Sequence, residues 1–468
     1  MRSVFVLLHR WCGLFIAGFL FVTGLTGAII SWDHQLDEWL NPHLTRVASR
    51  GEAIPSLELV RRIEAADPRA HVVFIPLLAE EGESLAFGVQ PRVDPATGRL
   101  YELDYNQVFV DPVTGDVLGT REWGAVSLSR ENLVSFLYKL HFSLHLPEMG
   151  GFDGWGVLLL GIVAIVWMLD CFSGLFLTFP ARRRHQGMGA SRVRGQAEAT
   201  GGAGLFMEAA GPPQAGAAPR EPKESWLRRW RPAWRIRWGG GRYKLNFDLH
   251  RAVSLWTWGV LLIVAFTAFS LNLYREVFFP LMSLVSDVTP GPFDTRTPAD
   301  RDRPILPQIG RAAILEQAGA EARRRGWPEP AGDLFYAADF GVYAVSFYYP
   351  GEDHGAAGVG PARLHFDGGD GRYLGDIQPW RGTAADIFVQ MQFPLHSGRI
   401  LGLPGRILIS FMGLVVAMLS VTGVYIWWKK ARSRRAMGRR TAPAAPIPPF
   451  RSARSLSAGA EEGISRGD

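Results

Sequence analysis

The sequence predicts an integral membrane protein in which four spanning α-helices carry two small α+β domains on one side of the membrane. Three observations lead to this prediction: four long apolar runs, a one-sided distribution of basic residues, and a motif set that occurs twice. The chain has 468 residues, of which 47% are hydrophobic and 20% are charged. This composition fits a protein that is part embedded and part water-exposed.

The four apolar runs predict transmembrane helices at residues 1–32, 154–179, 250–274 and 404–428. Each run contains the roughly 20 residues needed to cross about 30 Å of hydrocarbon. The first run is too long for the apolar part of a secretory signal, and its pattern recurs later in the chain. We therefore expect the first helix to be retained.

The basic residues predict the orientation of the chain in the membrane. They gather before the first and third helices and after the second and fourth, as at Arg2, Arg183, Lys244 and Lys429. The positive-inside rule then places both termini and residues 180–249 in the cytoplasm. The two predicted external domains are residues 33–153 and 275–403. Because the net charge of +6 follows from this arrangement, it does not indicate nucleic-acid binding.

The cytoplasmic segments differ in composition from the rest of the chain. Residues 185–225 are rich in Gly, Ala and Pro and predict a disordered linker, and we expect the tail at 429–468 to be disordered too. Residues 226–238 alternate Trp and Arg. An RNA-binding patch is one interpretation, but a segment at the membrane interface is favoured in a chain that is already embedded.

A set of short motifs occurs in the same order in both halves of the chain. The pairs are Leu8-His9-Arg10 with Leu249-His250-Arg251, Phe142-Ser143-Leu144-His145 with Phe393-Pro394-Leu395-His396, and Ser173-Gly174-Leu175 with Thr422-Gly423-Val424. Three matches in order predict an internal duplication. Both halves have the same orientation, so we expect a pseudo-twofold axis along the membrane normal.

Both external segments show the pattern of a helix followed by short strands. In the first, helical spacing at 56–66 precedes strand patterns at 72–76 and 85–89 and a hairpin at 108–119. The second repeats this order, with a helix at 309–318, strands at 334–336 and 343–349, and a hairpin at 364–375.

Four histidines lie at matching positions near the helix ends. His9 and His250 are at the cytoplasmic ends, and His145 and His396 are at the external ends. A twofold axis would bring each pair together, and two neutral imidazoles facing each other suit a non-covalent haem. The alternative is that these histidines only cap helices or contact lipid headgroups. No Cys-x-x-Cys-His occurs, which excludes a covalent c-type haem.

Three other residues are candidates for a role in these sites. Arg10 and Arg251 would meet haem propionates, or would serve only as positive-inside anchors. His141 lies four residues before His145 and could replace it, bind substrate iron or move protons, but its counterpart in the other half is Gln392. No role is predicted for the remaining histidines, namely His34, His43, His71, His185, His354 and His365.

Asp170 is the one acidic residue inside an apolar run, and its counterpart is Leu419. A carboxyl group at this depth is costly and therefore indicates either proton handling or a hydrogen-bonded structural role. We favour the structural role on the sequence alone.

The hairpin Val110-Asp-Pro-Val-Thr-Gly-Asp-Val-Leu-Gly119, set between membrane helices, resembles the PepSY domain. The Leu-His-Arg openings and the external histidine before the return helix resemble the PepSY-associated transmembrane family, over nearly the whole chain except the linker and tail. This resemblance implies a bacterial inner-membrane protein of the kind that includes iron-regulated proteins and siderophore reductases. It also implies b-type haem. The two histidine pairs of the duplication would then hold two such groups, with His9, His250, His145 and His396 as iron ligands.

These observations predict a transmembrane electron carrier that reduces a ferric siderophore on the external side. No acid–base or nucleophilic residue is needed for this activity, so none is predicted. No Gly-x-Gly-x-x-Gly follows a strand pattern, so the electron donor would be quinol or a cytoplasmic reductase. One alternative is a non-enzymatic, membrane-anchored PepSY binding or regulatory module. The other alternative is a transporter, which predicts broken helices and polar sites at the midplane. Asp170 is the one residue of the sequence that favours it.

Overall fold

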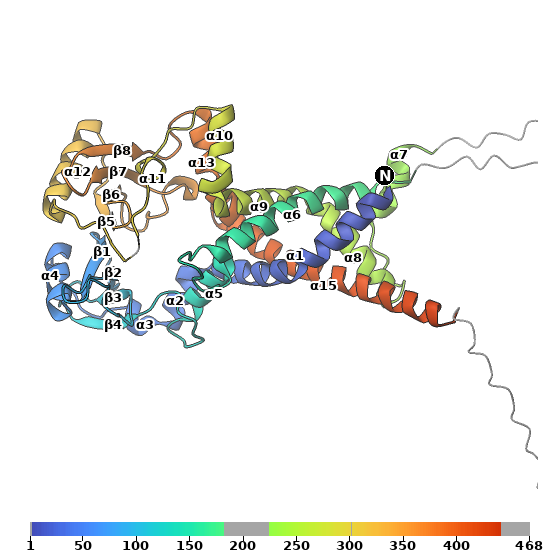
Figure 1. Ribbon diagram of the computed structural model, residues 1–468, viewed down its shortest axis with the longest axis horizontal. Coiled ribbons are helices and arrows are strands. Elements are labelled where there is room, and N and C mark those ends of the chain that lie inside the picture. The colour runs from blue at the N-terminus through green and yellow to red at the C-terminus, as the bar shows by residue number, and fades with distance from the viewer. Residues whose placement is uncertain (1, 182–223, 301, 441–468) are drawn as a thin grey trace, which may run out of the picture.

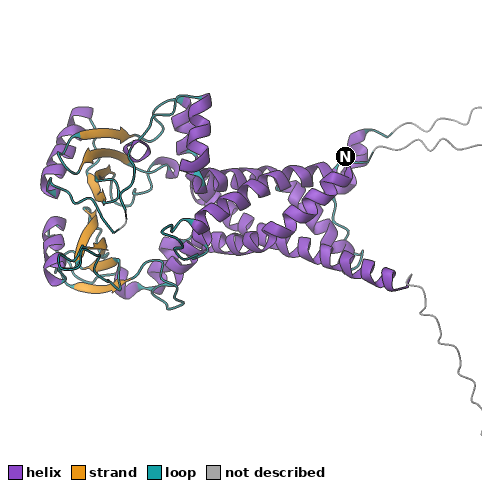
Figure 2. Ribbon diagram, viewed as in Figure 1, coloured by secondary structure: helices purple, strands orange, loops and turns teal. Residues whose placement is uncertain are grey.

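The computed structural model describes residues 2–181, 224–300 and 302–440 (Figure 1). The tail predicted to be disordered at 429–468 is helical over 429–440, where the last helix continues. Beyond residue 440 it lies outside the described residues, as does the predicted linker apart from 224 and 225. A bundle of long helices occupies one end of the molecule and a β-sheet the other (Figure 2). The N-terminus and the end of the last helix lie at the bundle end that is away from the sheet (Figure 1).

Three of the described helices are long and apolar enough to cross a membrane: α1 (Arg2–Ile30), α6 (Trp155–Thr178) and α15 (Gly402–Arg440). The remaining apolar run forms two helices, α8 (Arg242–Trp256) and α9 (Trp258–Asn272), which meet at 72°. The predicted span at 250–274 is therefore a bent pair of helices and not one straight helix.

The break between α8 and α9 falls at Thr257. Its hydroxyl donates a hydrogen bond to the Val253 carbonyl at 2.7 Å, a contact that often accompanies a helix bend. Hydropathy reports only how apolar a run is, so the bend was not visible in the sequence.

The bundle is held together by apolar packing and by two glycines that face each other. A Cβ on Gly24 would lie 2.7 Å from the Gly413 carbonyl oxygen, and one on Gly413 would lie 2.4 Å from the Gly24 oxygen. Small residues at such a position let helix backbones approach closely. The buried residues of the apolar core of the bundle are Ile16, Leu20, Val163, Leu261, Met412, Val415 and Val416.

All eight strands of the described chain form one antiparallel sheet, in the order β4-β3-β2-β1-β5-β6-β7-β8. The strands are β1 (Ala70–Pro76), β2 (Leu85–Pro91), β3 (Gln107–Val110), β4 (Val117–Arg121), β5 (Ala331–Ala337), β6 (Val342–Phe347), β7 (Ala362–Asp367) and β8 (Tyr373–Ile377). Each half of the chain thus supplies four consecutive strands.

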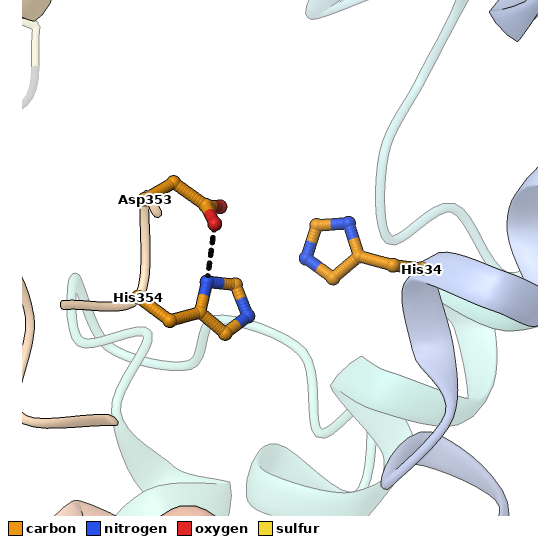
Figure 3. Close-up of side chains that lie close together, drawn as sticks. All are labelled: His34, Asp353 and His354. Carbon is orange, nitrogen blue, oxygen red and sulfur yellow. Dashed lines mark ion pairs between the residues drawn. The ribbon is translucent and has the colours of Figure 1, made fainter. Parts of the chain in front are cut away.

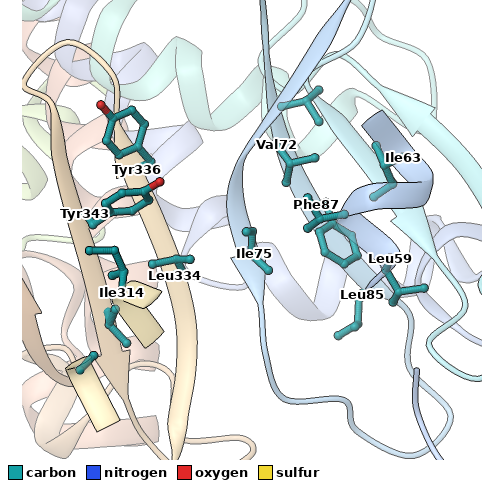
Figure 4. Packing of buried hydrophobic residues seen from close by; sticks show 14 of the residues in the cluster. Leu59, Ile63, Val72, Ile75, Leu85, Phe87, Ile314, Leu334, Tyr336 and Tyr343 are labelled. Atoms are coloured by element: carbon teal, nitrogen blue, oxygen red, sulfur yellow. The ribbon is translucent and has the colours of Figure 1, made fainter. Parts of the chain in front are cut away.

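The two halves meet where β1 pairs with β5, with Ile75 opposite Leu334. Sequence analysis predicted two separate domains, whereas the structure joins them into one sheet. An unpaired β1 or β5 would expose a row of backbone N–H and C=O groups, and the pairing satisfies both rows. The helices α4 (Ser56–Ala66) and α12 (Arg311–Arg325) add Leu59 and Ile314 to a core that is continuous across both halves (Figure 4).

Short helices connect the bundle to the sheet. Those of the first half are α2 (Asp33–Leu40), α3 (Pro42–Thr45) and α5 (Leu133–Ser143), and those of the second half are α10 (Phe279–Val285), α11 (Pro292–Thr295), α13 (Ala384–Gln390) and α14 (Gln392–Ser397). A further short helix, α7 (Trp226–Trp230), lies at the opposite end of the bundle (Figure 1). Two of these connecting helices, α5 and α14, carry histidines that face the bundle.

Candidate cofactor sites between paired histidines

The first site lies at the bundle end away from the sheet. The rings of His9 on α1 and His250 on α8 have centroids 6.1 Å apart and planes tilted by 57°. We call them the distal pair. Both line a cavity of about 480 Å³ among α1, α6, α8, α9 and α15. The structure thus brings together the two histidines of the Leu-His-Arg motifs.

The second site lies at the sheet end of the bundle. Here the rings of His141 on α5 and His396 on α14 also have centroids 6.1 Å apart and a tilt of 57°. We call them the sheet-side pair. They line a cavity of about 380 Å³.

His145, the predicted partner of His396, lies elsewhere. Its Nε2 donates a hydrogen bond to the Phe136 carbonyl at 2.9 Å, and its ring stacks on the Phe136 ring at 4.7 Å. The structure therefore corrects the sheet-side pair from His145 and His396 to His141 and His396.

The reason for this difference is where each helix ends. The helix α5 ends at Ser143, and Leu144 and His145 have positive φ angles of 54° and 52°. The helix α14 continues through His396 to Ser397. His145 has thus left its helix, and the histidine one turn earlier takes the position facing His396. Aligning the motifs residue by residue could not reveal this shift.

Each histidine of the distal pair is held through Nδ1. The Nδ1 of His9 donates to Asp170 Oδ1 at 2.8 Å. The Nδ1 of His250 lies 3.1 Å from the Leu419 carbonyl oxygen and 3.0 Å from Thr422 Oγ1. Asp170 and Leu419 are the residues that the repeated motifs align, so both rings are held at matching points of α6 and α15.

The sheet-side pair is held in the same way. The Nδ1 of His141 lies 3.0 Å from the Thr23 carbonyl oxygen and 3.1 Å from Thr26 Oγ1. The Nδ1 of His396 lies 3.0 Å from Thr267 Oγ1. Sequence reasoning missed these threonines, although Thr26 follows His9 at the same spacing as Thr267 follows His250.

The threonine hydroxyls fix where the imidazole proton sits. Thr26 donates its own hydrogen to the Val22 carbonyl at 2.9 Å, and Thr267 donates to the Ile263 carbonyl at 2.9 Å. Each hydroxyl must then accept from Nδ1–H. No described residue hydrogen-bonds the Nε2 of any of the four histidines, so each Nε2 lone pair remains available. An Nδ1 held by an acceptor with a free Nε2 is the usual state of a metal-ligating histidine.

The spacing of the rings fits a metal ion between them. With metal–nitrogen distances of about 2 Å, two imidazoles on opposite sides of one ion have ring centres about 6 Å apart. Glycines leave space for the rings, since a Cβ on Gly174 or Gly423 would lie 3.2 Å from Cε1 of His9 or His250. At the other site, a Cβ on Gly27 would lie 2.9 Å from Cε1 of His141.

Charged side chains distinguish the two cavities. The basic residues that line the distal cavity are Arg2, Arg10, Arg251, Lys430 and Arg434. Arg251 is already paired with Asp248 at 2.9 Å. The Nε atoms of Arg10 and Arg251 are buried without a hydrogen-bond partner among the described residues. Both predicted arginines thus reach the cavity, and Arg10 in particular keeps donor capacity for a carboxylate such as a propionate.

These apolar helices and paired sites define a multi-pass membrane protein. The profile of the PepSY_TM family, described as the PepSY-associated TM region, matches residues 6–200 and 225–430. The chain belongs to this family. No curated protein matched the sequence in the comparison.

Proposed function

We propose that this protein is a bacterial inner-membrane haem b protein that passes electrons across the membrane to reduce a ferric siderophore on the sheet side. The observation that carries the proposal is the presence of two histidine pairs at opposite ends of the bundle. Both pairs have the same ring separation and tilt, and all four Nε2 atoms are free of protein hydrogen bonds among the described residues.

In this proposal His9 and His250 hold one haem, and His141 and His396 hold the other. A haem iron with two imidazole ligands supplies a one-electron couple. The chain's own residues orient the imidazoles through Nδ1 and surround each site with apolar side chains. Arg10 and the neighbouring basic residues at the distal cavity would bind the propionates.

Apolar side chains connect the two cavities. Four residues line both cavities, namely Leu20, Trp167, Leu261 and Val416. These four apolar side chains therefore lie between the two sites. Trp167 is the one aromatic side chain among these four.

The membrane arrangement is part of the same proposal. The bent pair α8–α9 would be a span in addition to α1, α6 and α15, which gives four crossings. The sheet would lie in the periplasm and both termini in the cytoplasm. The two halves would derive from an internal duplication, which the matching Nδ1 contacts support. Electrons would come from quinol or a cytoplasmic reductase to the distal site.

The ferric siderophore follows from the resemblance to siderophore reductases. Reduction of Fe³⁺ to Fe²⁺ takes one electron and weakens binding by the hard oxygen ligands of a siderophore. No catalytic acid or base is required of the protein, only a docking surface beside the sheet-side pair.

The proposal can be tested with the purified chain under anaerobic conditions. The chain is reduced with dithionite, and the excess dithionite is then removed. Adding a ferric hydroxamate should reoxidise the protein and release one Fe²⁺, captured by a ferrous chelator, for each electron lost. The gallium complex, which is not reducible, is the matched control. Reoxidation that fails with the ferric complex would contradict the reductase activity. A protein that holds no haem at all would leave the PepSY binding module as the better account.

A further inference from the structure

Three side chains that the proposed electron path does not use converge beside the bundle. They are His34 near the start of α2, and Asp353 and His354 on the loop that follows β6 (Figure 3). Each offers one ligand atom, and these atoms all lie within 4.8 Å of one another. The two imidazole centroids are 5.3 Å apart. The cluster thus joins the two halves of the chain.

The carboxylate and the imidazoles of this cluster are arranged as in a metal site. Asp353 Oδ1 accepts a hydrogen bond from His354 Nδ1 at 2.8 Å. The other ring nitrogen of His354 is directed toward His34 (Figure 3). This contact leaves the other nitrogen of His354 as a ligand, and the second carboxylate oxygen of Asp353 can still coordinate an ion.

The loop that carries Asp353 and His354 is held in place by backbone contacts. The Gly360 N–H donates to the His354 carbonyl at 2.8 Å, and the Trp380 indole donates to the Ala356 carbonyl at 3.1 Å. A Cβ on Gly358 would lie 2.4 Å from the Cβ of Arg399, so this loop packs directly on Arg399.

The cluster lies beside the sheet-side cavity. Arg399 lines that cavity, as does Asp33, the residue before His34. The charge of Arg399 is partly balanced by Asp33 at 3.9 Å. The side chains of Asp353 and His354 are 52% and 32% exposed, so an ion from solution can reach them.

We propose that His34, Asp353 and His354 bind one divalent first-row transition-metal ion, such as Fe²⁺, Co²⁺ or Zn²⁺. Two imidazoles and one carboxylate favour these ions over Mg²⁺ and Ca²⁺, which prefer oxygen ligands. Three protein ligands leave further coordination positions for water. The ion ties α2 of the first half to the loop of the second half. This proposal goes beyond the haem proposal and does not depend on it.

The test uses the full chain in detergent, purified through a tag that contains no histidine. Co²⁺ is titrated and followed by its visible absorption, with excess Mg²⁺ present. We expect about one ion per chain, and a loss of affinity of at least about tenfold in His34→Ala and in His354→Ala. Asp353→Asn, which replaces the charged carboxylate ligand by a neutral amide, should also lose at least about tenfold.

The matched control is His43→Ala, because His43 is also an exposed histidine near a carboxylate, 3.9 Å from Glu131. Its affinity for Co²⁺ should equal that of the unmodified chain. If the alanine variants fold poorly, His34→Gln and His354→Gln replace them, with folding checked by gel filtration.

Absence of Co²⁺ binding, or equal binding in the unmodified chain and in both histidine variants, would overturn the proposal. Haem absorbance measured on the same samples keeps the two proposals separate, since a haem-free chain with intact Co²⁺ binding contradicts only the haem proposal.

Discussion

The distal and sheet-side pairs share one geometry but differ in what surrounds them. In both, the rings are 6.1 Å apart and tilted by 57°. The Nδ1 of His9 is hydrogen-bonded to the carboxylate of Asp170, which is 11% exposed. The Nδ1 atoms of the other three histidines contact threonine hydroxyls and backbone carbonyls. The positions of the four rings are thus repeated between the sites, whereas the charge next to them is not.

The basic residues around the two cavities also differ. Five basic residues line the distal cavity, whereas Arg399 is the one basic residue that lines the sheet-side cavity within the described chain. The two sites would therefore bind the same group in different electrostatic surroundings. The anionic propionates of a haem would be held more firmly at the distal site, and the reduction potentials of the two sites would differ.

The largest expected effect is the loss of a haem, and it distinguishes His141 from His145 as the ligand at the sheet-side site. Replacing His141 or His396 by alanine should remove one of two haems, because in the proposed arrangement each pair supplies both ligands of one iron. His145→Ala should retain both haems, since the ring of His145 is turned toward Phe136. Haem content per chain, from the pyridine haemochrome spectrum, measures this. Loss of a haem in His145→Ala with none lost in His141→Ala would refute the corrected pairing.

The second effect concerns Asp170. A carboxylate that accepts from Nδ1 makes His9 a more basic ligand and favours the oxidised iron. Asp170→Asn should therefore raise the midpoint potential of the distal haem by on the order of 60 mV, a tenfold change for a one-electron couple. The sheet-side haem is the internal control in the same redox titration. Equal shifts in both haems would show that Asp170 does not act through His9.

The smallest effect concerns His365, a buried histidine without the contacts of the paired ones. It is 1% exposed, and neither ring nitrogen has a hydrogen-bond partner among the described residues. Burial, with the nearby Arg363 charge, lowers the pKa of His365 to about 4. The unfolded chain binds this proton below about pH 6.5, and the folded chain only near pH 4. The contribution of neutral His365 to the free energy of unfolding is therefore complete above about pH 6.5, and it is lost as the pH drops toward 4.

The expected loss is up to about 3 kcal/mol between these limits. His365→Phe should flatten this part of the pH dependence of the melting temperature, while His43→Phe, at an exposed position, should leave it unchanged. An unaltered slope in His365→Phe would show that another group titrates.

Local patterns predicted the local structure well. The helix expected at 56–66 is α4 (Ser56–Ala66), and the hairpins expected at 108–119 and 364–375 are β3–β4 and β7–β8. These elements are set by spacing and turn residues that lie close in the chain. The distal pair was likewise predicted, because each histidine opens an apolar run within an identical Leu-His-Arg motif.

The features that sequence reasoning missed depend on contacts between distant residues. The pairing of β1 with β5 links strands from different halves. The choice of His141 over His145 depends on where α5 stops, and helix ends are poorly marked in a sequence. No role was predicted for His34 or His354, and only the fold brings them together.

The measurement that tests the central claim most directly is the haem content of the unmodified chain, purified after expression with ample haem supply. The account predicts a b-type pyridine haemochrome spectrum with two haems per chain, of which His9→Ala and His396→Ala each remove one. A chain that folds, yet carries no haem and gains none on titration with haemin, would contradict it.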